Sequence, residues 1–134
     1  MSHNQFTGSI PPSIGSLSNL SILYLHSNNL SSSIPKEIGK LMSLTNLELS
    51  NNQFTGSIPP SIGSLSNLQY LYLDDNNLFG SISVEIGKLM SLTDLNMSHN
   101  QFTGSIPPSI GSLSNLSILY LHNNNLSGSI PKEI

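Results

Sequence analysis

A repeat of 24 residues constrains this chain more than any other feature of its sequence. Equivalent leucines recur at that interval as Leu17, Leu41, Leu65, Leu89 and Leu113. Each unit reads approximately LxxLxxLxLxxNxLxGSIPxxIGx, with apolar residues at the same places. A period of this length is typical of a solenoid, in which each repeat buries its apolar face only by stacking on its neighbours.

The repeats divide the chain into one continuous series. A partial unit, 1–16, precedes the units 17–40, 41–64, 65–88, 89–112 and a clipped unit, 113–134. Counted with 17–40 as the first unit, odd units resemble odd units and even units resemble even ones. Residues 1–16 accordingly recur unchanged as 97–112. We predict a single solenoid segment over residues 1–134. Polar end caps are absent, so we expect a fragment of a longer protein that associates end to end when made alone.

Composition excludes several classes of function. The chain has four Lys, no Arg and seven Asp or Glu, which gives a net charge of −3 and no basic footprint for nucleic acid. It has no Cys, and therefore no disulfide scaffold, Cys-ligated zinc site or thiol nucleophile. No apolar run approaches the roughly 18 residues of a membrane span, and the N-terminus does not resemble a signal peptide. We expect no membrane contact by this segment.

Alternation of apolar and polar residues predicts a short strand in each unit. Leu23 and Leu25 flank Tyr24, so the two leucines point inward and the tyrosine points outward. The same triplet recurs in every unit, and stacking one strand per turn builds a parallel sheet with a spacing of about 4.8 Å. The outward side chains of this sheet form the first candidate binding face.

A polar residue interrupts the apolar pattern at the twelfth position of each unit. It is Asn28, Asn52, Asn76, Asn100 and Asn124. An amide among core leucines requires hydrogen-bond partners. We therefore predict a structural Asn ladder, in which each side chain bonds the backbone of its own turn and of the neighbouring turn.

The second half of each unit predicts the other sides of the solenoid. Ile34 and its equivalents indicate a second short strand, which Pro35 limits in length. Ile38 and its equivalents close a helical turn on the far side. We expect close backbone approach at Gly8 and its equivalents, and a reversal of the chain at Gly15 and its equivalents.

These motifs carry a resemblance that covers the whole chain. LxxLxLxxNxL resembles the leucine-rich repeat, and the following GxIPxxIG resembles its plant-specific subclass. The pattern is similar to the ectodomains of plant receptor-like kinases and receptor-like proteins, and to polygalacturonase inhibitors. The resemblance implies an α/β solenoid, a right-handed superhelix with a parallel sheet on its concave face. Short second strands and 3-10 or helical turns form the other sides.

The resemblance also implies a function and a location. We expect a protein- or peptide-binding module from a receptor-like kinase ectodomain, on the extracellular side of the plasma membrane or in the apoplast. Its partners would be a peptide or protein ligand and a co-receptor, with no cofactor. Any Ser/Thr kinase activity would lie in a domain absent from this chain. The alternative is a soluble apoplastic protein, either an inhibitor of a cell-wall-degrading enzyme or an ice-binding protein.

The candidate ligand-binding residues are the outward side chains of the first strand and those just after it. They are Tyr24, His26, Glu48, Tyr70, Tyr72, Asp74, Asp94, Asn96, Tyr120 and His122. Tyr side chains offer apolar area and a hydroxyl at a low cost in conformational entropy, which favours recognition of an extended ligand.

Other chemistry has weaker signals. His26 and His122 lie four repeats apart, as do His3 and His99, so we predict no metal site. No nucleophile elbow is present, and Asp74 and Asp75 would point to opposite faces of a strand, so we predict no enzyme activity.

Two surface patterns remain. Columns of Ser and Thr beginning at Ser9 and Thr7 would suit ice binding, although Phe79 interrupts one of them. Candidate N-glycosylation sites follow the N-x-S rule at Asn19, Asn29, Asn115 and Asn125.

Overall fold

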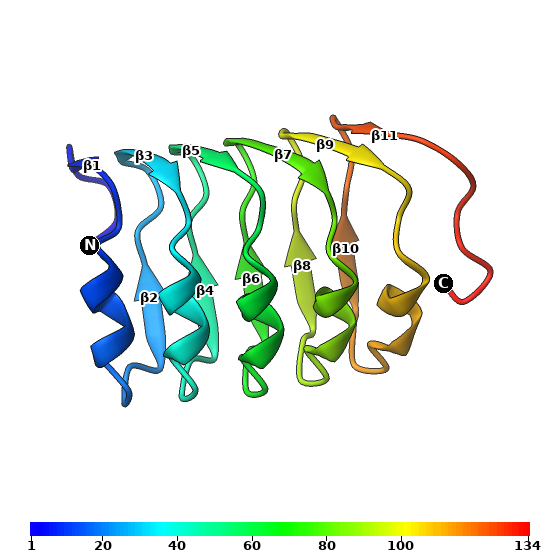
Figure 1. Cartoon of the computed structure of the whole chain (residues 1–134), viewed down its shortest axis with the longest axis horizontal. Coiled ribbons are helices and arrows are strands. Elements are labelled where there is room, and N and C mark those ends of the chain that lie inside the picture. Colours follow the sequence, from blue (N-terminus) through cyan, green and yellow to red (C-terminus); the bar gives the residue numbers. More distant parts are fainter.

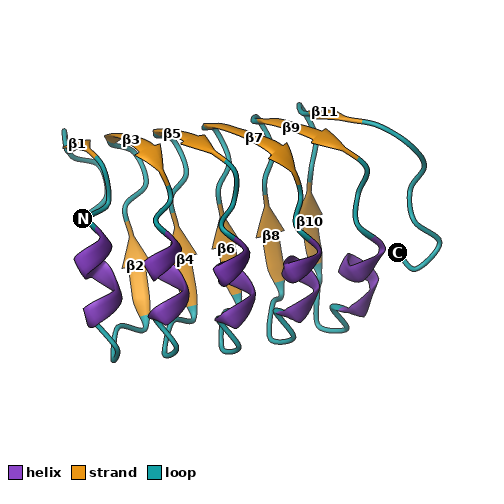
Figure 2. Ribbon diagram, viewed as in Figure 1, coloured by secondary structure: helices purple, strands orange, loops and turns teal.

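The chain folds into a solenoid whose successive turns lie side by side (Figure 1). The computed structural model describes all of residues 1–134. A full turn contains a strand, a second strand and a 3-10 helix, in that order. The two sets of strands and the row of 3-10 helices occupy different sides of the solenoid (Figure 2), so the apolar side chains are enclosed between them.

The first strands form a parallel sheet of five strands in the order β10-β8-β6-β4-β2. They are β2 (Ile22–Tyr24), β4 (Asn46–Glu48), β6 (Tyr70–Tyr72), β8 (Asp94–Asn96) and β10 (Ile118–Tyr120). Each residue pairs with the residue 24 positions away, as Tyr24 does with Glu48 and Glu48 with Tyr72. The repeat period is therefore also the register of this sheet, which forms the concave face.

The second strands form a parallel sheet of six strands in sequence order. They are β1 (Thr7–Gly8), β3 (Asn29–Ser33), β5 (Gln53–Gly56), β7 (Asn77–Ser81), β9 (Gln101–Gly104) and β11 (Asn125–Leu126). We expected these strands around the recurrent Ile, but β3 ends before Ile34. β7 likewise ends before Ile82, although Ser83 stands there in the place of Pro35, so the missing N–H of Pro is not what ends the pairing. In both turns the pairing stops before an Ile that is buried in the core.

Five short 3-10 helices cover the side opposite the concave sheet. They are η1 (Pro12–Ser16), η2 (Lys36–Lys40), η3 (Pro60–Ser64), η4 (Val84–Lys88) and η5 (Pro108–Ser112). Four follow a Pro in extended conformation, and η4 follows Ser83, whose hydroxyl oxygen accepts a bond from the Glu85 N–H at 3.2 Å. None of the helices has the length and hydropathy that crossing a membrane would take.

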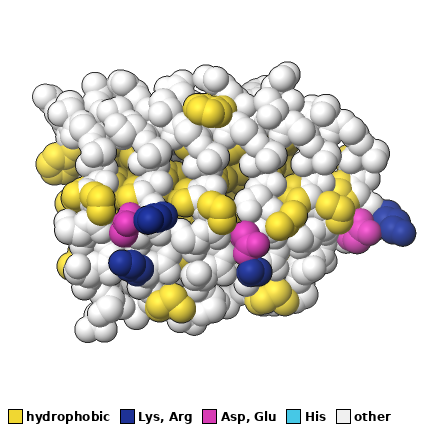
Figure 3. Space-filling model, viewed as in Figure 1, with side chains coloured by type: hydrophobic (Ala, Val, Ile, Leu, Met, Phe, Trp, Pro, Cys, Tyr) yellow, Lys and Arg dark blue, Asp and Glu magenta, His cyan; other side chains and the backbone are white.

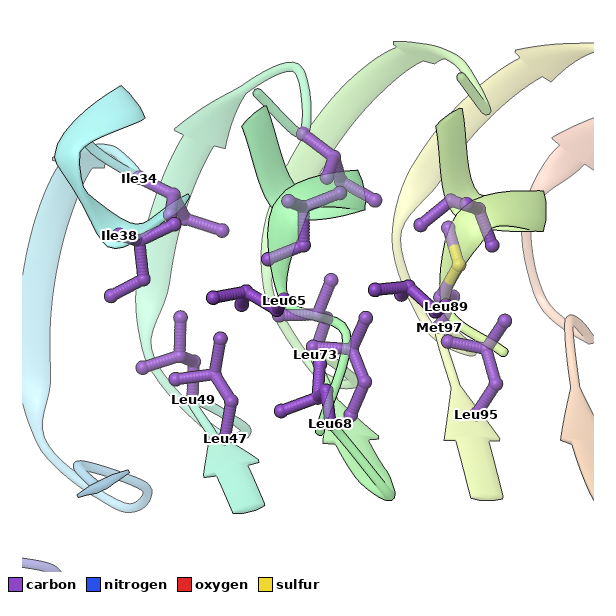
Figure 4. Close-up of a cluster of buried hydrophobic side chains, with 14 of the residues drawn as sticks. Ile34, Ile38, Leu47, Leu49, Leu65, Leu68, Leu73, Leu89, Leu95 and Met97 are labelled. Atoms are coloured by element: carbon purple, nitrogen blue, oxygen red, sulfur yellow. The ribbon is translucent and has the colours of Figure 1, made fainter. Parts of the chain in front are cut away.

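The core is one continuous apolar column. It contains 27 buried apolar residues, most of them Leu and Ile from every turn. Figure 4 shows side chains such as Leu47, Leu73 and Ile38 pointing toward one another between the concave strands and the 3-10 helices. Leu65 is 0% exposed, whereas its equivalent Leu17, which only the partial unit 1–16 precedes, is 50% exposed. Burial in this fold thus depends on the neighbouring turn.

The two glycine columns have roles opposite to those expected. Gly80 has φ of +84°, and an added Cβ would lie 3.7 Å from its nearest neighbour, so this position requires a left-handed backbone and no close approach. An added Cβ at Gly63, inside η3, would lie 2.7 Å from the Glu85 carbonyl oxygen of the next turn. Close approach therefore occurs at the 3-10 column, where Gly allows neighbouring helices to touch.

Candidate ligand-binding face

The Asn ladder holds the rim of the concave sheet. The Asn52 amide nitrogen donates to the carbonyl oxygens of Leu25, Leu49 and Ser50 at 3.0, 3.1 and 3.1 Å, and its oxygen accepts from the Leu30 N–H at 3.0 Å. Asn76 and Asn100 repeat this pattern one and two turns on. In each of these bonds the partner of the Asn side chain is a backbone group. The ladder amides therefore hold the scaffold together and are not directed at a ligand.

The residues just before the ladder adopt an unusual backbone. His3, Ser27, Asn51, Asp75, His99 and Asn123 all have φ between 51° and 57°. This left-handed conformation is uncommon outside Gly, and Asn, Asp and His tolerate it best. It places Asp74 and Asp75 in a turn after β6, not on a strand as we expected. The Asp74 carboxylate accepts a bond from the Ser50 hydroxyl at 2.6 Å, whereas Asp75 lies 3.9 Å from the His99 ring nitrogen.

Three rows of side chains cross the concave face, because residues 24 apart are aligned. The first row is Ile22, Asn46, Tyr70, Asp94 and Ile118. The second row is Tyr24, Glu48, Tyr72, Asn96 and Tyr120. The third row, just beyond the strands, is His26, Ser50, Asp74, Ser98 and His122. Both ends of the face present Ile, Tyr and His, and the acidic residues lie between them.

Two hollows of about 240 Å³ each lie on this face and share the side chains of Glu48 and Tyr72. Tyr24 and Tyr70 line the first hollow. Asp74, Asp94 and Tyr120 are among the residues lining the second. The structure thus brings the predicted aromatic and acidic side chains together into one groove across the strands. The predicted His26 does not line the groove but lies beside it, 3.7 Å from the Glu48 carboxylate and with its ring edge to face with that of Tyr24, 6.2 Å between centroids.

The electrostatics of the groove act on its central tyrosine. Burial raises the pKa of Tyr72 above 10.0, and the negative charges of Asp94 and Glu48 raise it further, with smaller contributions from Tyr70 and Asp74. Tyr72 therefore keeps its proton and remains a hydrogen-bond donor. The negative charges of Asp94 and Glu48, which help to hold this proton, also attract a cation that enters the groove.

Charge is divided between the faces. Lys36, Lys40 and Lys88 lie in η2 and η4, beside Glu37 and Glu85 of the same helices. Figure 3 shows Lys and acidic side chains side by side on the face that carries the 3-10 helices.

The remaining acidic residues are separated from the Lys side chains. Apart from Glu133, close to Lys132 near the C-terminus, they are Glu48, Asp74, Asp75 and Asp94, all on the concave sheet or in the turns that follow it. That side of the molecule has no Lys.

Two pairs of histidines were missed at the sequence level. The rings of His3 and His26 lie 4.8 Å apart, and those of His99 and His122 lie 5.2 Å apart, both edge to face. Comparison of equivalent positions cannot find them because the members are 23 residues apart, diagonal neighbours on successive turns. In the structure, a backbone bond from the His3 N–H to the His26 carbonyl holds the two residues side by side. No group of three or more His, Cys, Asp and Glu is arranged to hold a metal ion.

The remaining surface candidates are all outside the groove. The Ser and Thr columns point outward from the six-stranded sheet, and the Phe79 ring, 50% exposed, stands among them. The sequon residues Asn19, Asn29 and Asn125 are exposed. Asn115 is also exposed, but its amide donates to the Met90 carbonyl at 2.9 Å.

Comparison with known proteins agrees with this geometry. The family model of a leucine-rich repeat region matches residues 3–100. The chain belongs to the leucine-rich repeat family. A second model, for two copies of the leucine-rich repeat, matches residues 91–132 of the same series. No curated protein matches the sequence.

Solved structures similar to this leucine-rich repeat segment are plant receptor ectodomains. The plant peptide hormone receptor RGFR1 in complex with RGF2 is 40% identical, with a TM-score of 0.97 over 98% of this chain and 21% of that one. The Arabidopsis receptor kinase HAESA, in complex with the peptide hormone IDA and the co-receptor SERK1, is 43% identical, with a TM-score of 0.94 over 98% of this chain and 22% of that one.

A third neighbour extends the pattern. The ectodomain of the membrane receptor kinase GASSHO1/SCHENGEN3 from Arabidopsis thaliana, in complex with CASPARIAN STRIP INTEGRITY FACTOR 2, is 41% identical, with a TM-score of 0.96 over 98% of this chain and 16% of that one. The segment thus spans about a fifth of the length of these receptors or less. Ectodomains of this fold are typically non-catalytic.

Proposed function

We propose that this segment binds an extended peptide or protein ligand on its concave face, as part of the ectodomain of a plant receptor-like kinase. The observation that carries the proposal is the groove of aligned Tyr and acidic side chains on a scaffold whose charged residues are otherwise few. Exposed Tyr side chains are typical anchors of protein interfaces. Similar ectodomains have been solved with peptide hormones and a co-receptor, which supports a peptide ligand and a co-receptor as partners.

The same proposal gives the segment a location and a limit. It would lie outside the cell, at the plasma membrane, as the ectodomains of membrane receptors do, and it would carry glycans at Asn19, Asn29 or Asn125, which are exposed. The segment itself would be non-catalytic. Kinase activity would belong to another part of a longer chain.

Binding to a peptide library tests the concave face directly. Random nonapeptides displayed on phage are selected on the immobilised 134-residue chain, and the affinities of synthetic binders are measured. Replacing Tyr24, Tyr72 and Tyr120 together by Ser should weaken binding about tenfold or more, because the aromatic anchors are lost. The control is Phe79→Ser, which removes an exposed ring from the six-stranded sheet, on another side of the solenoid. Binding that survives the triple substitution, or that is lost in the control, contradicts the proposal.

We also propose that the chain associates end to end when it is made alone. Leu17 at one end and Ile130 and Ile134 at the other are exposed, whereas their equivalents Leu65, Ile82 and Ile86 are buried by neighbouring turns. Chromatography with light scattering should give oligomers, in proportions that rise with concentration. A stable monomer at all concentrations would show that the exposed ends do not associate.

A further inference from the structure

The turn 65–88 differs from the other odd turns in a way that singles out one part of the groove. It differs from turn 17–40 at eight positions, whereas residues 113–134 differ from 17–38 at two. The eight positions are Gln69, Tyr70, Asp74, Asp75, Phe79, Gly80, Ser83 and Val84, and none of them is buried. On the concave side, Ile, His and Ser are replaced by Tyr70, Asp74 and Asp75. The substitutions thus leave the scaffold unchanged and make the centre of the face aromatic and acidic.

The even turns contribute two further acidic residues to the centre of the concave face. Asp94, on β8, is aligned with Tyr70, and Glu48, on β4, is aligned with Tyr72. The half-buried Asp94 carboxylate has no hydrogen-bond or ion-pair partner in the structure, although every buried polar side-chain atom has one. Asp74 has one partner, the neutral Ser50 hydroxyl. Negative charge in the centre of the groove is therefore uncompensated, since the Lys residues of the chain lie elsewhere.

We propose that the ligand is an extended peptide segment whose central residue is Lys or Arg, with its cationic side chain lying against the ring of Tyr72, between Asp94 on one side and Asp74 on the other. This inference rests on the function proposed above and specifies the ligand chemistry. Carboxylates on both sides of an aromatic ring suit an organic cation, which gains from their negative charge, from a charge-assisted hydrogen bond to one of them and from the π-face of the ring. A bare metal ion is a poorer occupant, because no three potential ligands converge.

The two ends of the face define the rest of the ligand. Tyr24 and Tyr120 lie four strand spacings apart, which is about 19 Å at about 4.8 Å for each spacing. An extended peptide covers this distance with about six residues at about 3.3 Å each. Because Ile22 and Tyr24 are repeated as Ile118 and Tyr120, both ends offer an apolar patch. The ligand is therefore a short segment with apolar residues on each side of a central basic one, and the acidic centre sets its register.

Binders selected from the nonapeptide library provide the test. We expect enrichment of Lys or Arg at a central position. Replacing that residue by norleucine in a synthetic binder should weaken binding about tenfold or more, as expected for lost bonds between charged groups. The double variant Asp74→Asn/Asp94→Asn should weaken binding of the parent peptide by a similar factor. It should discriminate little between the parent and the norleucine peptide.

A matched variant controls for net charge. Glu37→Gln/Glu85→Gln also removes two negative charges, but from the 3-10 helices, and should change affinity less than twofold. Circular dichroism confirms that both double variants are folded. Wild-type affinity should fall as salt rises, and that dependence should be smaller in Asp74→Asn/Asp94→Asn than in the control.

Failure of this inference can be told apart from failure of the proposed function. Peptides that depend on Tyr24, Tyr72 and Tyr120 but lack a basic residue, or bind Asp74→Asn/Asp94→Asn as tightly as wild type, overturn the basic-ligand inference alone. If no peptide is selected, or if every binder is indifferent to the Tyr residues, the concave face is not the binding site. In that case both proposals are wrong.

Discussion

Turns 65–88 and 17–40 share the same interior and differ only on their surfaces. All eight differences fall at exposed or half-buried positions, and two of them convert His26 and Ser27 of one turn into Asp74 and Asp75 of the other. The Leu positions, the ladder Asn and the 3-10 Gly are the same in both turns. A repeat scaffold can therefore change the chemistry of one face at a single turn without changing the packing that stacks it on its neighbours.

Truncation of a shared interior residue should have the largest effect. Leu71 is 0% exposed, so Leu71→Ala removes a packed side chain and leaves a cavity, for an expected loss of about 3–4 kcal/mol of unfolding free energy. Leu119, its equivalent on β10, is only half-buried, and Leu119→Ala should cost about half as much or less. Urea unfolding followed by circular dichroism measures both. Equal losses would show that burial does not depend on the neighbouring turn.

Loss of a ladder amide should come next. Asn76→Ala leaves the Phe54 N–H and the carbonyl oxygens of Leu49, Leu73 and Asp74 without their side-chain partner. We expect a loss of about 2–3 kcal/mol, the cost of unsatisfied buried groups. The control is Asn77→Ala, since the neighbouring Asn77 is exposed and makes no side-chain bond, and its effect should stay within about 0.5 kcal/mol. A similar loss in both variants would mean that the ladder contributes nothing specific.

The glycine columns sharpen the same comparison. In Gly63→Ala the new Cβ would meet the backbone of η4, and separating the two turns should cost about 2 kcal/mol. Gly80→Ala has room but must adopt a left-handed backbone, which costs about 1 kcal/mol. Turn 17–40 already has a non-glycine residue there, Ser32 with φ of 66°. Thermal unfolding of the two variants tests the order, and a larger loss for Gly80→Ala would restore the roles that the sequence suggested.

The sequence predicted the strands, their stacking and the Asn ladder, but it missed two contacts between successive turns. Alternation around Leu23 and Leu25 was sufficient for the strand, and the plant-type motif for the family. The role of Gly63 depends on the position of Glu85 in the next turn, which the period does not reveal. The pair of His3 and His26 lies on a diagonal between turns. The binding role of the groove residues remains a prediction.

The backbone that follows each strand of the concave sheet was also predicted wrongly from the sequence, as a continuation of the strand. Asp74 and Asp75 follow β6 after one intervening residue, Leu73, and strand alternation would place them on opposite faces. The left-handed backbone at Asp75 ends that alternation, so Asp74 remains on the groove and Asp75 faces His99. Local sequence carries a weak signal of this turn, since its column consists of His, Ser, Asn and Asp.

The smallest expected effect is a pH dependence that separates the acidic centre from the ends of the face. The folded chain holds the pKa of Tyr72 above the value of about 10 expected when unfolded. The unfolded chain therefore loses this proton first. The associated stability is complete below about pH 10 and is lost as pH rises from there through the folded pKa.

Substitution of one groove carboxylate should reduce this dependence. In Asp94→Asn the pKa of Tyr72 should move back toward its ordinary value, because the charge that raises it most after burial is removed. Carbon-13 NMR of labelled tyrosine follows each ring through an alkaline titration and separates Tyr72 from Tyr24 and Tyr120. The control Glu85→Gln, on the opposite side, should leave all three titrations unchanged. An unchanged Tyr72 titration in Asp94→Asn would show that the centre of the groove is screened by water. It would then be no more attractive to a cation than its two ends.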